Sequence, residues 1–171
     1  EALPQAHAAA SALLAFAEHT QGQALSHLQA LRVARADAAI ELPPATRRNL
    51  ELVQTLRGES SPTLFSLLDT CMTSMGSRLL KRWLLEPQRD RTEAQARLQA
   101  TAVLREAAGP LAWNKLREQL KGTSDVERIT ARTALYQVRP RELVALQLAL
   151  EKSAALAAPL AGQGGLLGAV A

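Results

Sequence analysis

A succession of helix-start signals limits what this chain can fold into. Ser61 followed by Pro62 predicts a short helix, with the serine as N-cap and the proline at the first helical position. Thr73 predicts the N-cap of the next helix, over residues 74–85. That helix ends before Pro87, because a proline disfavours helical geometry in the residue that precedes it. These signals predict two short, separate helices in this part of the chain.

Two further signals have the form of capping boxes, in which a polar residue starts a helix and a glutamate follows three residues later. The run 90–93 (Asp-Arg-Thr-Glu) predicts a helix that stops at Gly109. The run 124–127 (Ser-Asp-Val-Glu) predicts a helix from Val126 to about Val138. Acidic residues in these runs are explained by capping and by the helix dipole, and they need no catalytic role.

A helix over 111–120 lies between these two, and Pro140 predicts the first turn of a last, long helix. Apolar residues in the long helix recur at helical spacings and form a seam that suits a partner helix. The residues of this seam are Leu143, Leu146, Leu150 and Ala157.

Composition supports packed helices. The chain is 47% hydrophobic but only 3% aromatic, so its apolar content is mostly Ala, Leu and Val. The shortage of aromatic residues disfavours single-strand readers that stack bases on several rings. Residues 4–20 predict a first helix, residues 28–42 contain a weak hairpin signal, and residues 45–56 are undecided. The predicted fold class is mostly α, a multi-helix core domain with a small early β element.

The helix over 74–85 carries an apolar half and a basic edge. Gly76 lies within the apolar half, which is explained if another backbone approaches too closely for a side chain. The basic edge consists of Arg78, Lys81 and Arg82. Three alternatives remain for it: a solvated face, a contact with a DNA backbone, or pairing with carboxylates of a neighbouring helix. Arg47 and Arg48 follow the two prolines that interrupt the secondary structure at 43–44, and they are a further weak sign of nucleic-acid binding.

Motifs for catalysis are missing from the sequence. It contains neither a P-loop nor a Gly-x-Gly-x-x-Gly run, so we expect no nucleotide cofactor and no enzymatic activity in this chain. Cys71 is the only cysteine and is expected to be a small buried hydrophobe, and no metal site is expected. A single cysteine favours a cytoplasmic protein. We also expect no membrane span, and we expect the chain to be a piece of a longer polypeptide.

From residue 42 onward, the sequence resembles the core (lever) domain of the bacterial MutS family of DNA mismatch repair proteins. The runs that carry the resemblance agree with the family in order and spacing, and they are 46–52 (TRRNLEL), 63–69 (TLFSLLD), 75–84 (MGSRLLKRWL), 125–129 (DVERI) and 139–143 (RPREL). The residues of these motifs expected to be structurally important are Arg48, Asn49, Gly76, Arg78, Trp83, Asp125, Glu127 and Arg128. Residues 3–40 resemble, less sharply, the helix and hairpin that follow the family's connector domain.

The resemblance implies three segments: 1–41 after the connector domain, 42–160 as the core domain before the clamp insertion, and 161–171 as a truncated Gly-rich end. It also implies that the full-length protein is a DNA-dependent ATPase that uses ATP and Mg. Its implied partners are mismatched double-stranded DNA, bound through other domains, a second copy in a homodimer, and MutL. The core would couple the ATPase to the DNA clamp.

Two other functions are compatible with the residues alone. The chain could be a stand-alone basic helical DNA-binding domain, since its net charge is +4. Alternatively, it could be a helical adaptor that docks a partner helix on the seam described above.

Overall fold

The computed structural model describes residues 3–22, 28, 30 and 38–169. The chain divides into two compact units, residues 1–35 and residues 36–171. The first unit contains the helix α1 (Pro4–Gln21), which begins with a proline and ends at Gly22. Gly22 adopts the left-handed conformation that glycine tolerates, with a φ of 67°. The first predicted helix is therefore confirmed.

The second unit begins with two short helices, α2 (Pro44–Asn49) and α3 (Leu64–Leu68). The prediction that Ser61 caps α3 is wrong, because the N-cap is Thr63. The Thr63 hydroxyl accepts a hydrogen bond from the Ser66 amide at 3.1 Å, and the Ser66 hydroxyl accepts one from the Thr63 amide at 2.8 Å. This reciprocal pair satisfies two amides at once, which a lone serine two residues earlier does not do.

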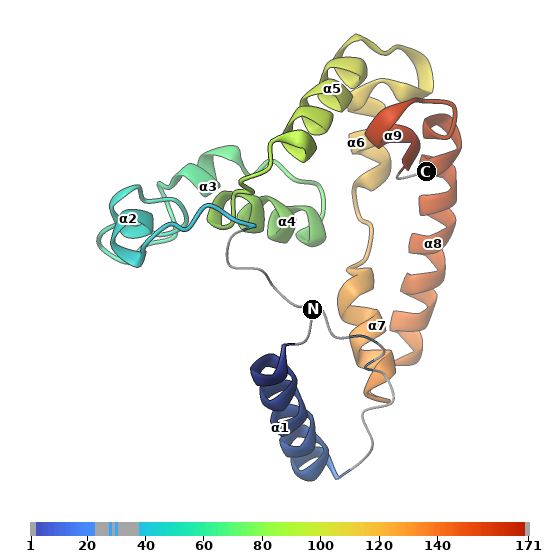
Figure 1. The fold of residues 1–171 in the computed structure, drawn as a ribbon. Coiled ribbons are helices and arrows are strands. Elements are labelled where there is room, and N and C mark those ends of the chain that lie inside the picture. Colours follow the sequence, from blue (N-terminus) through green and yellow to red (C-terminus); the bar gives the residue numbers. More distant parts are fainter. Residues whose placement is uncertain (1–2, 23–27, 29, 31–37, 170–171) are drawn as a thin grey trace. The chain divides into compact units, whose positions relative to one another are not determined.

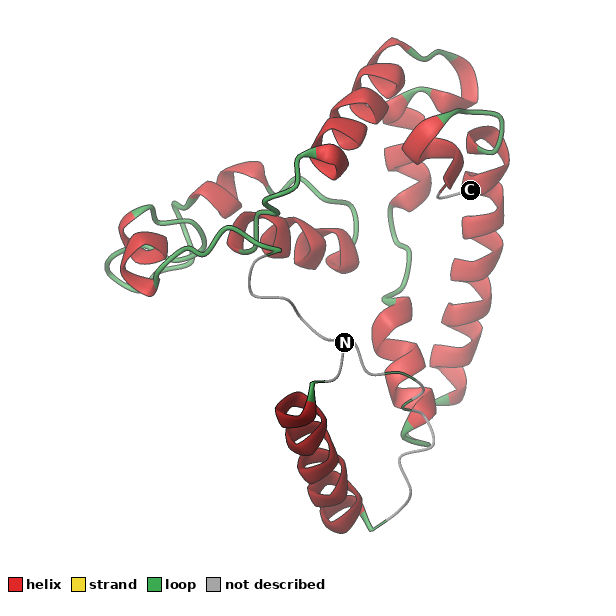
Figure 2. Ribbon diagram, in the orientation of Figure 1, coloured by secondary structure: helices red, strands yellow, loops and turns green. Residues whose placement is uncertain are grey.

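Helix α4 (Ser74–Leu85) matches the prediction in both its bounds and its cap. The Thr73 hydroxyl accepts a hydrogen bond from the Gly76 amide at 3.1 Å. One antiparallel bridge pairs Ala39, which precedes α2, with Gln88, which follows α4. This bridge is the β structure found in the described residues. The hairpin predicted over 28–42 falls mostly outside the described residues. Figure 2 shows helices and loops throughout the described part, which confirms the mostly α fold class.

Helix α5 (Thr92–Glu106) leads through a short 3-10 turn, η1 (Gly109–Leu111), into α6 (Trp113–Leu120). The capping box predicted for 90–93 does not form. Asp90 instead accepts hydrogen bonds from the backbone amide and hydroxyl of Thr92, at 2.9 and 2.7 Å, and so stabilises the turn before the helix.

Helix α7 (Val126–Ala134) is shorter than predicted, and its cap is Asp125 rather than Ser124. The chain leaves the helix at Tyr136, whose φ of 55° is left-handed. Helix α8 (Pro140–Leu160) then runs beside α6 and α7, and α9 (Gly165–Ala169) contacts α5 (Figure 1).

Each helix of this unit buries few apolar side chains. They come from the α2–α3 connection and from α6, α7, α8 and α9: Leu52, Leu116, Ile129, Ala149 and Leu167. Helix α8 turns Ala149 inward, whereas Leu143 and Leu150 of the predicted seam are 46% and 55% exposed. Leu146 and Ala157 of the seam are half-buried, so only part of the seam lies on the packed side of α8.

Helix α8 is also long and apolar enough, by length and composition alone, to cross a membrane, with a mean hydropathy of 1.4 over its most apolar window. The expectation that the chain has no membrane span stays a prediction beside this helix. Its contacts with α6 and α7 are those of a packing helix, and the Lys152 ammonium donates to the Lys121 carbonyl at the end of α6, at 3.1 Å.

Gly76 has close neighbours, as expected, but they are side chains of the preceding loop rather than another backbone. A Cβ placed on Gly76 would lie 3.2 Å from the Thr73 hydroxyl oxygen and 3.3 Å from Cys71 Cβ. Contacts this short require the neighbours to move. A larger side chain at this position would therefore disturb the cap of α4 as well as the loop.

We predict that Gly76→Leu lowers the free energy of unfolding by about 1–3 kcal/mol, although leucine is the better helix former. Urea denaturation followed by circular dichroism would measure the change. Gly162→Ala is the matched control, because a Cβ there meets no atom within 4 Å. A Gly76→Leu variant with an unchanged or higher denaturation midpoint would contradict the close contact.

Candidate functional site: the ion-paired junction of α4 and α7

The site is built around Asp125, which ends the loop before α7. Its Oδ1 accepts a hydrogen bond from the Arg128 amide at 3.2 Å and so caps the helix. Capping fixes the carboxylate at the positive end of α7, where the helix dipole favours a negative charge. One carboxylate thus begins the helix and remains available to partners from elsewhere in the chain.

Those partners come from α4. Arg78 reaches Asp125 with both terminal nitrogens, at 2.6 Å to Oδ2 and 2.8 Å to Oδ1. The Ser74 hydroxyl, one turn earlier on α4, donates to Oδ2 at 2.9 Å. Arg78 also contacts the carboxylate of Glu127, in the first turn of α7. A two-nitrogen contact of this kind fixes orientation as well as distance, since the planar guanidinium matches the planar carboxylate.

Hydrogen bonding keeps the Asp125 carboxylate ionised in a largely shielded position. The Asp125 side chain is only 16% exposed, whereas that of Arg78 is 43% exposed. The hydrogen bonds from Arg78 hold the pKa of Asp125 well below its ordinary value of 3.8, aided by the Arg128 amide and the Ser74 hydroxyl. The hydrogen bonds that Arg78 donates to Asp125 and, with a smaller effect, to Glu127 raise the pKa of Arg78. The pair is therefore ionised at neutral pH.

A second ion pair joins α7 to α8. Arg132 Nε lies 3.3 Å from the Glu142 carboxylate, whose other oxygen accepts a hydrogen bond from the Arg139 amide at 2.7 Å. Arg132 also donates to the Gln137 carbonyl at 2.9 Å, across the connection between the two helices. Glu142 thus begins α8 and contacts α7, just as Asp125 begins α7 and contacts α4.

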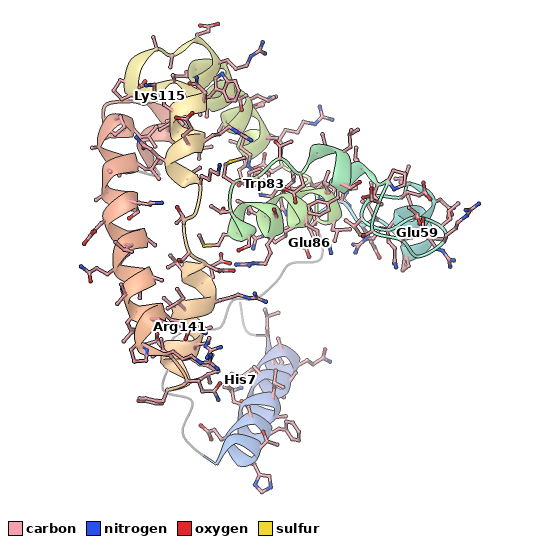
Figure 3. All side chains as sticks on the ribbon, turned by 180° about the vertical axis from the view of Figure 1, so that it is seen from behind. His7, Glu59, Trp83, Glu86, Lys115 and Arg141 are labelled. Atoms are coloured by element: carbon pink, nitrogen blue, oxygen red, sulfur yellow. The ribbon has the colours of Figure 1, made fainter. Side chains whose placement is uncertain are left out.

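Polar contacts also link the remaining helices of this unit. Trp83, which Figure 3 labels on α4, lies under the guanidinium of Arg97 on α5, with 3.7 Å from the Arg97 carbon to the ring centroid. Arg117 on α6 donates to the Thr70 carbonyl, in the loop before α4, at 2.8 Å. The contacts therefore run from α5 through α4 and α7 to α8, and from α6 to the α3–α4 loop.

The structure brings together only part of the predicted site. Arg78, Asp125 and Glu127 meet, and Arg128 contributes its amide, while its 80% exposed side chain lies 4.0 Å from Asp125 Oδ2. Lys81 and Arg82 are exposed and form no ion pair within the described residues. Arg48 and Asn49 lie on α2, away from the junction in sequence, and Arg48 makes a long hydrogen bond of 3.4 Å to the Leu56 carbonyl.

Several contributors are not predicted from the sequence. Ser74, Arg97, Arg117 and Glu142 each make a contact described above, and only Glu142 carries a sequence signal, since it is the third residue of a helix that begins with a proline. The others are polar residues on helix surfaces whose partners lie far away in sequence. No local pattern distinguishes them from solvated residues.

Cys71 and the candidate metal ligands are the side chains to consider for chemical roles. The expectation that Cys71 is buried is wrong, because the residue is exposed. Desolvation and the neighbouring Asp69 raise the pKa of the Cys71 thiol, which lowers its share of reactive thiolate. Within the described residues, no three His, Cys, Asp or Glu side chains are placed to hold a metal ion.

We predict that Asp125→Asn makes the stability of the chain less sensitive to acid. A group with a depressed pKa in the folded state stabilises the fold above its unfolded pKa, and this contribution is lost as the pH falls below about 3.8. Asparagine keeps the N-cap but removes the charge. Unfolding free energies between about pH 7 and pH 2 should therefore fall less steeply for Asp125→Asn than for the unmodified chain.

Glu118→Gln is the control for this comparison, because Glu118 is exposed and forms no ion pair with the described residues. It should leave the acid slope unchanged. Parallel curves for Asp125→Asn and the unmodified chain would show that the junction does not hold the carboxylate ionised.

Comparison with protein families bears directly on this arrangement. The family model described as MutS domain III matches residues 45–167, which run from the first turn of α2 to the start of α9. The match includes both ion pairs and the Trp83–Arg97 contact, and it spans most of the chain. The chain belongs to the MutS family of DNA mismatch repair proteins, and residues 45–167 are its domain III.

Proposed function

We propose that this chain is the helical lever of a MutS-family protein and transmits nucleotide-dependent changes between an ATPase and the parts that grip DNA. The observation that carries the proposal is the junction at Asp125, because it ties α4 to the start of α7 through both terminal nitrogens of Arg78. Coupling between distant sites needs elements with defined packings that both sites can bias. A two-nitrogen ion pair at a helix start supplies such a defined packing.

The neighbouring contacts support the same role. Arg132 and Glu142 continue the connection from α7 to α8, and Trp83 with Arg97 continues it from α4 to α5. Each link lies at or near a helix end, where a small rotation of one helix changes the direction of the next. The helices would therefore move as a set rather than one at a time.

Several properties of the complete protein belong to this proposal. ATP and Mg would be bound by a separate ATPase domain, and mismatched double-stranded DNA by other domains of the same polypeptide. A homodimer, MutL as a partner and a cytoplasmic location complete the proposed setting. The segment itself would have no catalytic function.

A stand-alone DNA-binding role has less support from the structure. One of the three cations that could follow a DNA backbone, Arg78, is engaged by two carboxylates. Lys81 and Arg82 remain exposed, but two cations on one helix form a short and weak electrostatic footprint. The adaptor role rests on the exposed Leu143 and Leu150, and nothing in the described residues shows what would cover them.

The proposal predicts that Arg78→Gln in the full-length protein weakens the link between DNA binding and ATP hydrolysis. The measurement is the ratio of the ATPase rate with mismatched DNA to the rate without DNA. We expect this ratio to fall by about fivefold, the size of a typical coupling of roughly 1 kcal/mol between sites. Arg82→Gln, four residues away on the exposed face of the same helix, should leave the ratio unchanged.

A full-length Arg78→Gln protein that folds and keeps the unmodified ratio would argue against a lever function for this junction. Equal losses for Arg78→Gln and Arg82→Gln would instead assign the effect to the positive charge of α4, and with it to DNA contact.

A further inference from the structure

A cavity lined by three arginines lies between α2 and the loop that follows it, apart from the α4–α7 junction. Its volume is about 620 Å³. The cationic wall consists of Arg47 and Arg48 from α2 and Arg57 from the loop, and aliphatic side chains such as Val53 and Leu56 complete it. Among the described residues, none of those that line the cavity is acidic.

The positive charge of this cavity is uncompensated within the described part of the chain. None of its arginines forms an ion pair there, and Arg48 makes only the long hydrogen bond to the Leu56 carbonyl. Arg47 Nε is buried without an acceptor. Oε1 of the Glu51 carboxylate accepts a hydrogen bond from the Leu56 amide, at 2.7 Å, and Glu51 forms no ion pair with these arginines. A buried donor without an acceptor is costly, so the site favours a ligand that supplies one.

The loop side of the cavity is fixed in shape before any ligand arrives. The Thr55 amide donates to the Glu59 carbonyl at 2.8 Å, and the Gly58 amide donates to the Thr55 carbonyl at 2.9 Å. Gly58 has a φ of 88°, which closes this turn and which other residues rarely adopt. Figure 3 labels Glu59 at the end of the turn. Arg57 therefore projects from a rigid turn and not from a free loop, which reduces the ordering cost of binding.

We propose that this cavity binds an acidic segment of a protein, with carboxylates on the three guanidinium groups and an aliphatic side chain against Val53 and Leu56. Arginine binds carboxylates with paired hydrogen bonds, and arginine with apolar neighbours is typical of the centres of protein interfaces. A DNA backbone fits the cavity less well. It offers charges along an extended rod and no aliphatic group to cover the apolar wall.

The test uses the whole 171-residue chain and a short fluorescein-labelled peptide of alternating glutamate and leucine. Fluorescence anisotropy should show saturable binding, and a matched peptide of glutamine and leucine should not bind. Arg57→Gln should weaken binding by about fivefold or more, because it removes a charge-assisted contact from a rigid turn. In NMR spectra, the Nε–H signal of Arg47 should shift as the peptide binds.

Arg105→Gln is the matched control, since Arg105 is an exposed arginine on α5 outside this cavity. Circular dichroism would establish that each variant folds, and Arg57→Lys, which keeps a charge without the planar fork, should restore binding only in part. Three results would overturn the proposal: no binding of the acidic peptide, equal weakening by Arg57→Gln and Arg105→Gln, or displacement of the peptide by a short DNA duplex with the same dependence on Arg57.

Discussion

Asp125 is the residue on which the arrangement of the second unit depends most. Its carboxylate caps α7 through the Arg128 amide and holds Arg78 and Ser74 of α4 at the same time. Because both oxygens are used, the start of α7 cannot rotate freely against α4 without breaking a charged hydrogen bond in a largely shielded position. One side chain thus begins a helix and links it to another helix that is distant in sequence.

This dependence follows from the way the apolar residues are distributed. Each helix contributes few buried side chains, and the buried ones are scattered over several elements. Dispersion and burial of apolar area therefore leave the relative orientation of the helices weakly determined. Directional contacts at helix ends, between Arg78 and Asp125 and between Arg132 and Glu142, supply the missing orientation. Such contacts suit a domain whose helices must transmit a change of orientation.

The sequence predicted helices and caps where the signal was local. The bounds and the cap of α4 are confirmed, because the cap bond joins Thr73 to the Gly76 amide only three residues along the chain. The cap of α3 was misplaced because two candidate residues lie close together, and only Thr63 has Ser66 as its reciprocal partner. Asp125 was likewise passed over for Ser124, although an ionised carboxylate next to an arginine is the stronger acceptor.

Long-range pairing was beyond the reach of sequence patterns. Arg78 had three open alternatives because its carboxylate partners are 47 and 49 residues away. The inward face of α8 is predicted only in part, since leucine occurs on several faces of that helix and its neighbours decide which one is buried. Family resemblance identified Arg78, Asp125 and Glu127 as important residues without indicating that they touch.

A double-mutant cycle between Arg78 and Asp125 tests the central claim most directly. Urea unfolding at neutral pH would be measured for Arg78→Gln, Asp125→Asn and the double variant. Asparagine is chosen at residue 125 because it can still cap the helix. If the two side chains hold α4 and α7 together, the double variant will lose clearly less stability than the sum of the two single losses. Strictly additive losses would contradict the account, because they would mean that the two residues act independently.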